Sequence, residues 1–382
     1  MGEGESTMEN LAVKSNFWQG KTVLVTGHTG FKGSWLSLWL QELGCEVIGL
    51  ALDPPTNPSL FDQANVAKEM TSLHADIRDL EKVKGIFKEH KPEIVFHLAA
   101  QPLVRFSYQE PVETYQTNVM GTLNIIEAIR NINSVRSVVM ITTDKCYENK
   151  EWVWGYREDE PMGGHDPYSS SKGCAELLIA SFRASFFPNE KFNEHKTGIA
   201  TARAGNVIGG GDWAKDRLIP DSIRALMKNQ SVKIRNPNAK RPWQYILESI
   251  SGVLWLAVKM YEEDKFNEAW NFGPDKNYDS LRVEDVVKRT MKNWNIKGDI
   301  EIQNNSDMLY ESESLLLDSS KADKRLGWKN VFLIDQALSE TVEWYKTYHE
   351  NNKDMKQFTM DQIKNYTALA QENNLIWTKW EN

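Results

Sequence analysis

Short apolar runs alternate with stretches of helical periodicity through the first half of the chain, and this alternation limits the fold more than any other feature. Five runs are predicted to be buried strands: 21–26, 46–51, 72–76, 93–99 and 137–143. Helices are predicted between them, at 31–44, 79–90 and 112–130. Apolar strands separated by helices indicate a parallel sheet with helices on both faces. Right-handed crossovers then give a doubly wound α/β sheet.

The pattern loosens after about residue 200, which indicates a smaller second lobe. Segments rich in Gly and Trp at 205–213 and 236–244 are predicted to be loops, and a helix–strand block follows at 281–303. Two more helices are predicted at 319–328 and 333–348. We expect a flexible leader at 1–17, a first domain at 18–205 with its sheet completed by part of 206–275, a C-terminal lobe mainly at 206–350 and a helical tail at 351–382.

Composition excludes several classes of function. The 382 residues carry a net charge of −8 and no basic stripe, which argues against nucleic acid as a partner. No run approaches the roughly 18 apolar residues that cross a bilayer, and the leader does not resemble a secretory signal. The three cysteines, Cys45, Cys146 and Cys174, form no CxxC pair, so a cytoplasmic protein is expected. The latter two are expected to be buried. The scattered histidines predict no metal site.

A glycine-rich loop follows the first predicted strand. Gly27, Gly30 and Gly33 have the spacing GxxGxxG and open an amphipathic helix, the context of a dinucleotide-binding turn. The free N–H groups and the dipole at the start of that helix attract a pyrophosphate. Asp53, after the second strand, is placed to bind ribose hydroxyls and to repel a 2′-phosphate, which favours NAD over NADP. Two nearby groups, His28 and Lys32, leave NADP open. Residues 18–205 are therefore expected to form an NAD-binding domain of the Rossmann type.

Tyr168 and Lys172 are four residues apart on a predicted helix, 167–187. That spacing places both side chains on one helix face. An ammonium beside a phenol favours the phenolate, so we expect the pKa of Tyr168 to be lowered and the side chain to act as a base. A hydroxyl at the end of the fifth predicted strand, Thr143, is the expected third member of the group.

These motifs resemble the extended short-chain dehydrogenase/reductase family, over about residues 18–350. The resemblance implies that Thr143, Tyr168 and Lys172 are catalytic, with Tyr168 as the base. It implies that Asp76 and Ile77 lie against adenine. It assigns the following residues to NAD: Gly27, Thr29, Gly30, Phe31, Lys32, Gly33, Asp53, Asp76, Ile77, Leu98, Ala99, Ala100, Gln101, Asn118, Thr142, Tyr168 and Lys172.

Thr143 is followed by an acid and an amine, Asp144 and Lys145. Within the family, simple epimerases need only the base and the cofactor, whereas sugar nucleotide 4,6-dehydratases also need an acid and a base to eliminate water. The resemblance implies that Asp144 protonates the departing 6-hydroxyl and that Lys145 takes the carbon 5 hydrogen. A lysine is a poor base at neutral pH unless its surroundings lower its pKa, so electrostatic stabilisation by Lys145 is the open alternative. The alternative without a catalytic role is that this pair forms a polar turn in contact with solvent.

The Asp-Lys pair stands where dehydratases that act on dTDP-glucose usually have Asp-Glu, and it resembles the branch of the family that acts on CDP-glucose. Further similar stretches are GHTGFKGSWLSLWL (27–40), TTDKCYEN (142–149), DPYSSSKGCAEL (166–177) and RAGNVIGGGDWAKDRLIPD (203–221). The resemblance implies a lyase that converts CDP-glucose to CDP-4-keto-6-deoxy-glucose, in deoxysugar biosynthesis such as that of lipopolysaccharide O-antigens. Alternatives are a dehydratase or epimerase for dTDP-glucose, UDP-glucose or GDP-mannose, and more remotely a non-catalytic regulator that senses dinucleotides.

The C-terminal lobe is expected to bind the sugar nucleotide. Asn206 follows the sixth strand, at a position where family members contact the diphosphate. Arg217 and Arg241 are expected to bind the phosphates, because one guanidinium group can donate two parallel hydrogen bonds to the oxygens of a phosphate. The helices at 112–130 and 167–187 are apolar on two sides, which predicts a homodimer or homotetramer built through four helices.

Overall fold

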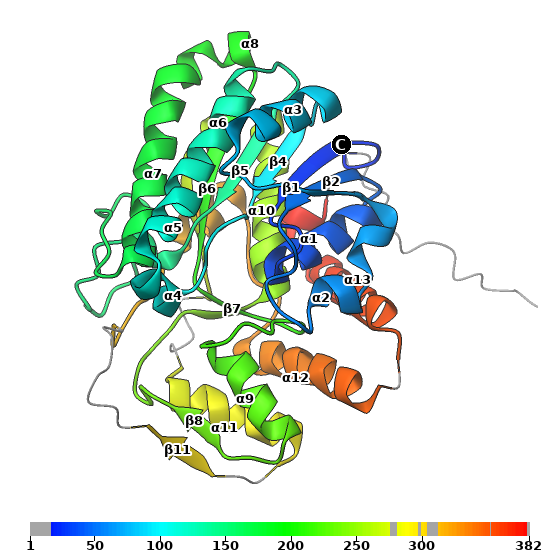
Figure 1. The fold of residues 1–382 in the computed structure, drawn as a ribbon, viewed down its shortest axis with the longest axis vertical. Helices are drawn as coiled ribbons and strands as arrows, with labels where there is room; N and C mark the ends of the chain where they lie inside the picture. Colours follow the sequence, from blue (N-terminus) through cyan, green and yellow to red (C-terminus); the bar gives the residue numbers. More distant parts are fainter. Residues whose placement is uncertain (1–16, 276–280, 297–298, 304–311, 352, 380–382) are drawn as a thin grey trace, which may run out of the picture.

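The computed structural model describes residues 17–275, 281–296, 299–303, 312–351 and 353–379, so the expected leader lies outside the described residues except for Phe17. Seven parallel strands form the central sheet in the order β10–β6–β5–β4–β1–β2–β3 (Figure 1). The strands are β1 (Thr22–Thr26), β2 (Glu46–Ala51), β3 (Thr71–His74), β4 (Ile94–His97), β5 (Ser137–Ile141), β6 (Gly198–Ala204) and β10 (Ala269–Phe272). The predicted doubly wound sheet is confirmed, and strand order reverses beside β1.

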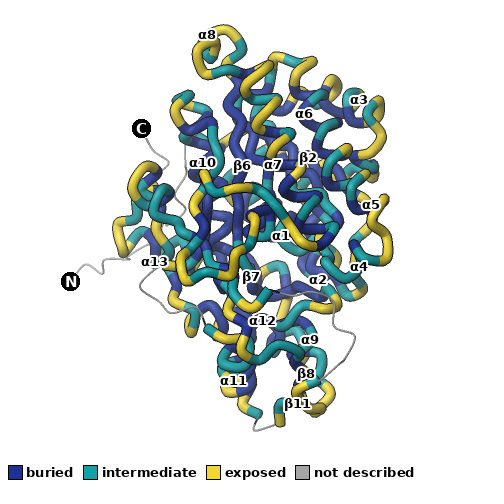
Figure 2. The backbone as a smooth tube through the Cα atoms, turned by 90° about the vertical axis from the view of Figure 1, so that its left-hand side faces the viewer, coloured by how far each residue is buried: buried dark blue, intermediate teal, exposed yellow. Residues whose placement is uncertain are grey.

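Both faces of the sheet are buried because its strands carry apolar side chains at successive positions. In β1, Val23 and Val25 join one core, whereas Leu24 joins the core on the opposite face. Figure 2 shows the strands as the dark, buried centre of the molecule. A sheet of this kind needs a helical layer on each side.

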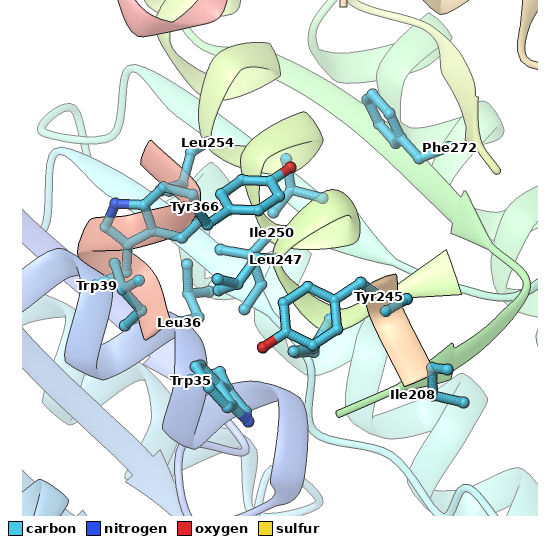
Figure 3. Close-up of a cluster of buried hydrophobic side chains, with 14 of the residues drawn as sticks. Trp35, Leu36, Trp39, Ile208, Tyr245, Leu247, Ile250, Leu254, Phe272 and Tyr366 are labelled. Carbon is cyan, nitrogen blue, oxygen red and sulfur yellow. The ribbon is translucent and has the colours of Figure 1, made fainter. Parts of the chain in front are cut away.

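Helices cover both faces. On one face lie α1 (Phe31–Glu42) and α10 (Ile246–Glu262), with α13 (Met355–Glu372) packed against them; on the other lie α3 (Leu80–His90), α6 (Thr122–Arg130) and α7 (Pro167–Phe186). The C-terminal helix α13 packs back on the sheet domain, where the rings of Tyr366 and Trp39 meet edge to face at 5.9 Å (Figure 3). The segment expected to be a tail thus contributes to the main core.

The second lobe lies below the carboxyl ends of the strands (Figure 1). It contains α9 (Leu218–Met227), α11 (Val283–Trp294), α12 (Ile334–Glu350) and the parallel pair β8 (Val232–Ile234) and β11 (Ile300–Ile302). A second parallel pair, β7 (Asn206–Ile208) and β9 (Trp243–Tyr245), connects it to the sheet domain. The loops predicted at 205–213 and 236–244 are therefore partly wrong. Each contributes a short strand whose partner is distant in sequence, which local composition does not reveal.

Other elements are short. They are α2 (Leu60–Gln63), α4 (Val104–Gln109), α5 (Pro111–Tyr115) and α8 (Phe192–His195), with a π-helical turn at Gln116–Gly121 between α5 and α6. The helix predicted at 319–328 shrinks to a turn that includes Ala322–Leu326 and ends where Gly327 adopts a φ of +67°. Cys174 is exposed and corrects the expectation of burial, whereas Cys146 is buried. Among the described helices, none has the length and apolarity to cross a membrane.

Candidate active site

The glycine loop joins β1 to α1, and its glycines are required by close backbone contacts. Gly27 has a φ of +74°, and a Cβ there would lie 2.8 Å from the backbone nitrogen of Ala99. A Cβ on Gly33 would lie 2.1 Å from the carbonyl oxygen of Gly27. No side chain caps the start of α1 at Gly30, so its first N–H groups remain available. This arrangement fits a pyrophosphate, as the sequence predicted.

The end of β2 presents the groups expected at the ribose. Asp53 is exposed, with His74 as its neighbour at 3.5 Å. Thr29 donates a hydrogen bond to the carbonyl of Leu52 at 2.9 Å. His28 is buried against Ser72, and burial lowers its pKa to about 4, so the imidazole is neutral. A neutral, buried His28 offers no charge to a 2′-phosphate, which weakens the case for NADP.

The two residues expected at adenine already have protein partners. The carboxylate of Asp76 accepts hydrogen bonds from the guanidinium of Arg78 at 2.6 to 3.1 Å. Ile77 is buried against Gly121, where an added Cβ would lie 2.4 Å from its side chain. Both therefore help to form the wall beside the π-helical turn.

The loop after β4 is fixed by side chains that hold its backbone. The hydroxyl of Thr26 accepts from the N–H groups of Leu98 and Ala99 at 3.1 Å. Asn118, in the π-helical turn, accepts from the N–H of Gln101 at 2.8 Å and donates to its carbonyl at 3.0 Å. The same amide donates to Ser171 of α7 at 2.9 Å. Asn118, expected to contact the cofactor, thus ties this loop to the helix that carries Lys172.

His97, at the end of β4, belongs to this framework and was not predicted. Its ring nitrogens lie 2.7 Å from the hydroxyl of Thr26 and 3.0 Å from that of Thr122. Burial lowers the pKa of His97 to about 3, with Lys172 adding to the effect, so the ring stays neutral. The sequence showed a lone histidine in a strand, a pattern that gives no sign of this role.

Tyr168 and Lys172 lie in the first turns of α7, as the spacing predicted. Asp166 caps this helix by accepting from the N–H of Ser169 at 2.9 Å, and Pro167 occupies its first turn. The side chain of Thr143 acts on the phenol of Tyr168 and favours its ionised form. Burial, however, raises the pKa of Tyr168 to about 12, whereas burial lowers the pKa of Lys172 to about 8. The expected lowering for Tyr168 is therefore wrong for the chain alone, because desolvation outweighs the stabilising charges.

Asp144 and Lys145 form an ion pair at the end of β5. The Nζ atom of Lys145 lies 3.0 Å from Oδ1 of Asp144, and the same oxygen accepts from Thr143 at 3.0 Å. The Asp144 side chain is fully buried, whereas that of Lys145 is 30% exposed. Among the described residues, Oδ2 of Asp144 has no hydrogen-bond partner. A buried carboxylate oxygen without a partner is costly, so the solvated-turn interpretation of this pair is wrong.

Behind these residues lies a second buried carboxylate, Glu176, which the sequence did not reveal. It accepts from the hydroxyls of Thr142 and Thr201, the latter at 2.8 Å, and from the guanidinium of Arg203 at 2.7 Å. Arg203 also donates to the hydroxyl of Tyr147 at 2.8 Å. Thr142, expected at the cofactor, thus takes part in a network that joins β5, β6 and α7 just behind the strand ends.

The three residues expected to bind substrate lie in different settings. The side-chain oxygen of Asn206 is buried and, within the described part of the chain, has no hydrogen-bond partner. Arg217 precedes α9 and pairs with Asp212 at 2.8 Å, and its charge acts on Tyr168. Arg241 donates to backbone carbonyls at 312 and 313, at 2.6 and 3.3 Å. Asn206 and Arg217 therefore belong to the same end of the molecule as the tyrosine, and Arg241 braces a neighbouring loop.

Two expected residues remain. Phe31 and Lys32 are the first two residues of α1, and the ring of Phe31 packs close to Gly209. The charges that act on Lys32 are those of Arg217, Asp144, Lys145 and Lys172. Within the described ranges, no cluster of three or more His, Cys, Asp or Glu side chains could hold a metal ion.

Comparison with known proteins decides the family. A family model described as GDP-mannose 4,6 dehydratase matches residues 24–341. The chain belongs to this family. Among curated dehydratases, the CDP-glucose 4,6-dehydratase of Salmonella typhimurium is 51% identical over 94% of this chain and 99% of its own length. The human dTDP-D-glucose 4,6-dehydratase is 25% identical, over 88% of this chain and 93% of its own length.

Solved structures of an epimerase and of a dehydratase share the fold of this chain. A UDP-glucose 4-epimerase from Thermotoga maritima with UDP-glucose superposes with a TM-score of 0.71 at 24% identity, covering 86% of this chain and 99% of that one. A dTDP-glucose 4,6-dehydratase from Bacillus anthracis in complex with NAD has a TM-score of 0.72 at 19% identity, covering 87% and 98%. Epimerases and dehydratases share this fold, so function has to be argued from the site.

Proposed function

We propose that the protein is an NAD-dependent lyase that converts CDP-glucose to CDP-4-keto-6-deoxy-glucose. The observation that carries this proposal is the ion pair of buried Asp144 with Lys145 beside Thr143 and Tyr168, in which one carboxylate oxygen has no partner among the described residues. An epimerase has no need of such an acid. The 51% identity to a CDP-glucose 4,6-dehydratase supports both the reaction and the nucleotide.

The chain fits NAD at the positions where the cofactor would be held. The cradle formed by Gly27, Gly30 and Gly33 admits backbone contact with a pyrophosphate, and exposed Asp53 is available to ribose hydroxyls. Lys172 is buried and makes no hydrogen bond to any described side chain, which suits a role at the nicotinamide ribose. The chemistry that bound NAD would supply is hydride transfer, from carbon 4 of the sugar and back to carbon 6.

The tyrosine end of the site handles the 4-hydroxyl. Thr143 would hold the substrate hydroxyl while Tyr168 takes its proton. The high pKa of Tyr168 in the chain alone means that this base depends on positive charge from its surroundings. Arg217 already provides part of that charge, and Lys172 lies one helical turn along α7.

The acid–amine pair handles the elimination. Oxidation at carbon 4 acidifies the hydrogen at carbon 5, so water can leave once a base takes that hydrogen and an acid protonates the 6-hydroxyl. If the ammonium proton of Lys145 moves along the 3.0 Å contact to Asp144, the pair becomes a neutral amine and a carboxylic acid, the two groups required. Stabilisation of the enolate by the Lys145 charge is the alternative role.

Substrate binding is assigned to Asn206, Arg217 and Arg241, at the diphosphate. The partnerless oxygen of Asn206 and the position of Arg217 near Tyr168 support the first two. Arg241 could bind phosphate only with nitrogen atoms that its backbone contacts leave available. Of the three, Arg241 therefore has the weakest structural support.

A homodimer or homotetramer built through α5 and α7 is proposed for the assembly. Val112 of α5, Met120 of the adjoining π-helical turn and Leu177 of α7 are exposed by 67%, 49% and 61%. Apolar side chains at such exposure on neighbouring helices suit a four-helix interface with a second copy. The free cysteines support a reducing cytoplasm as the place of action.

The proposal is tested by incubating the purified protein and NAD separately with CDP-glucose, dTDP-glucose, UDP-glucose and GDP-mannose. We expect a 4-keto-6-deoxy product from CDP-glucose alone. Turnover of a different nucleotide sugar would overturn the substrate assignment, and formation of a 4-epimer in place of the keto sugar would overturn the reaction.

A further inference from the structure

The residues proposed for the elimination lie on a short segment that leaves the sheet after β5. Asp144 begins a 3₁₀ turn that ends at Cys146, and Thr143 precedes this turn. A 3₁₀ turn is closed by few backbone hydrogen bonds, and their geometry is poorer than in an α-helix. The positions of Asp144 and Lys145 therefore depend on the contacts that hold the two ends of the segment 143–146.

The upstream end of this segment is held at Thr142. The N–H of Thr142 donates to the carbonyl of Ala202 in β6 at 3.0 Å. Its hydroxyl donates to Oε1 of Glu176, which lies on α7 four residues after Lys172. A spacing of four places Glu176 and Lys172 on one face of the helix. Thr142 thus ties the strand end beside Thr143 to the helix that carries Lys172.

The downstream end is held at Tyr147, whose side chain is buried. Its hydroxyl accepts from Nη1 of Arg203 in β6 at 2.8 Å and donates to Oδ1 of Asn271 in β10 at 2.7 Å. The carbonyl of Cys146, the residue before it, accepts from the N–H of Gly163 at 2.8 Å. The end of the turn is therefore fixed to two strands of the sheet and to the loop before α7.

An ion pair joins the two anchored ends. Nη2 of Arg203 donates to Oε2 of Glu176 at 2.7 Å, and both side chains are buried. Burial opposes the charge of Glu176, but Arg203 and two threonine hydroxyls outweigh it and hold the pKa of this carboxyl below its usual range. Hydrogen bonds between ionised groups are the strong ones. Thr142, Glu176, Arg203 and Tyr147 thus form one chain of contacts, the clamp, that runs from one end of the segment 143–146 to the other.

We propose that the clamp is a positioning device for the elimination step, because it fixes where Asp144 and Lys145 stand relative to the bound sugar. This deepens the proposed function and rests on it, since it requires a reaction in which these two residues move protons. Catalytic side chains need supporting contacts behind them, and a misplacement of about 1 Å can lower a rate by about 100-fold. Glu176, Arg203 and Tyr147 act through the segment and are positioning residues.

The first test compares Tyr147→Phe with Tyr156→Phe as the control. The two rings stack at 5.1 Å, but the hydroxyl of Tyr156 donates to Asn149 in the following loop and lies outside the clamp. We expect product formation from CDP-glucose to fall by about 10- to 100-fold in Tyr147→Phe. The rate at which NADH absorbance appears in a single turnover should change by less than about threefold, because Thr143 is still held through Thr142. The ratio of the two rates does not depend on the fraction of protein that is folded. Tyr156→Phe should keep both rates.

The second test compares Thr142→Val with Thr201→Val. Each variant removes one buried hydroxyl that donates to Glu176, but only Thr142 borders the catalytic segment. We expect Thr142→Val to lower product formation by about tenfold and Thr201→Val to leave it unchanged. The Kd for NAD should be the same in both variants, which separates the clamp from a contact of Thr142 with the cofactor.

Several results would overturn the proposal. Product formation by Tyr147→Phe at the wild-type rate would show that the clamp does not position the segment. Equal losses of NADH formation and product formation would show a general distortion of the fold. Equal effects of Thr142→Val and Thr201→Val, or a raised Kd for NAD in Thr142→Val alone, would remove the link to Glu176. Failure of the proposed function would instead be seen in the wild type, as a 4-epimer in place of the keto sugar.

Discussion

Asp144 and Glu176 are two buried carboxylates on neighbouring elements, and they are held in opposite ways. Both oxygens of Glu176 accept hydrogen bonds from within the chain, and Arg203 neutralises its charge. Asp144 has one oxygen paired with Lys145 and Thr143, and its other oxygen has no partner among the described residues. The first carboxylate stabilises the fold behind the strand ends. The second lacks one partner, as expected of the group that we propose as the acid for the substrate.

Removing the incomplete carboxylate should have the largest effect. We expect Asp144→Asn to lower kcat for CDP-glucose by about 1000-fold, because general acid catalysis is lost, while the fold is kept. Product formation and thermal unfolding should be measured side by side. Asp159→Asn, an exposed acid in the following loop, is the control and should be fully active. A kcat of Asp144→Asn within tenfold of wild type would show that Asp144 is not the general acid.

Removing the completed carboxylate should instead reduce stability. Glu176→Gln leaves the guanidinium of Arg203 buried without a counter-charge, which should lower the free energy of unfolding by about 3 to 5 kcal/mol. Urea denaturation measures this. The control is Glu127→Gln, which breaks a solvent-exposed pair with Arg130 and should leave unfolding nearly unchanged. Equal effects of the two variants would show that Glu176 is not needed for the fold.

A third buried carboxylate, Glu248, accepts hydrogen bonds but forms no ion pair with any cation in the described part of the chain, so it extends the comparison. It accepts from the backbone N–H groups of Val331 and Phe332 and from the hydroxyl of Tyr366 at 2.7 Å, which ties α10 to α13. Burial raises the pKa of Glu248 to about 7. The folded state therefore favours the protonated form, so this contribution is complete below the unfolded pKa of about 4.5 and is lost as pH rises to about 7.

Glu248→Gln should remove this pH dependence. The amide can accept from the two backbone N–H groups and donate to Tyr366, so the fit is kept without a charge. We expect the variant to gain stability relative to wild type as pH rises, by up to about 3 kcal/mol near pH 8. Urea denaturation at pH values of about 5 and about 8 measures the difference. Parallel loss of stability in both proteins would mean that Glu248 does not titrate on unfolding.

The sequence predicted those parts of the molecule that depend on local pattern. The glycine loop, the strands and the Tyr168–Lys172 helix were found because turn geometry, burial and helical spacing each leave a short-range signal. The pairing of Glu176 with Arg203, 27 residues away, and that of α13 with α1 leave none. The pKa of Tyr168 was predicted in the wrong direction for a similar reason. The helical spacing of Tyr168 and Lys172 reveals a neighbouring positive charge, but it does not reveal how deeply the phenol is buried, and burial is the larger effect on its pKa.

The proposed role of Lys145 as the base is tested most directly by exchange of the carbon 5 hydrogen with solvent. CDP-glucose is incubated in heavy water with NAD and wild type, Lys145→Ala, or the control Lys150→Ala, whose lysine lies in the same loop at 3.7 Å from Glu148. We expect deuterium at carbon 5 with wild type and the control, and none with Lys145→Ala, which should still oxidise carbon 4. Unchanged exchange in Lys145→Ala would contradict the account and leave the amine only an electrostatic role.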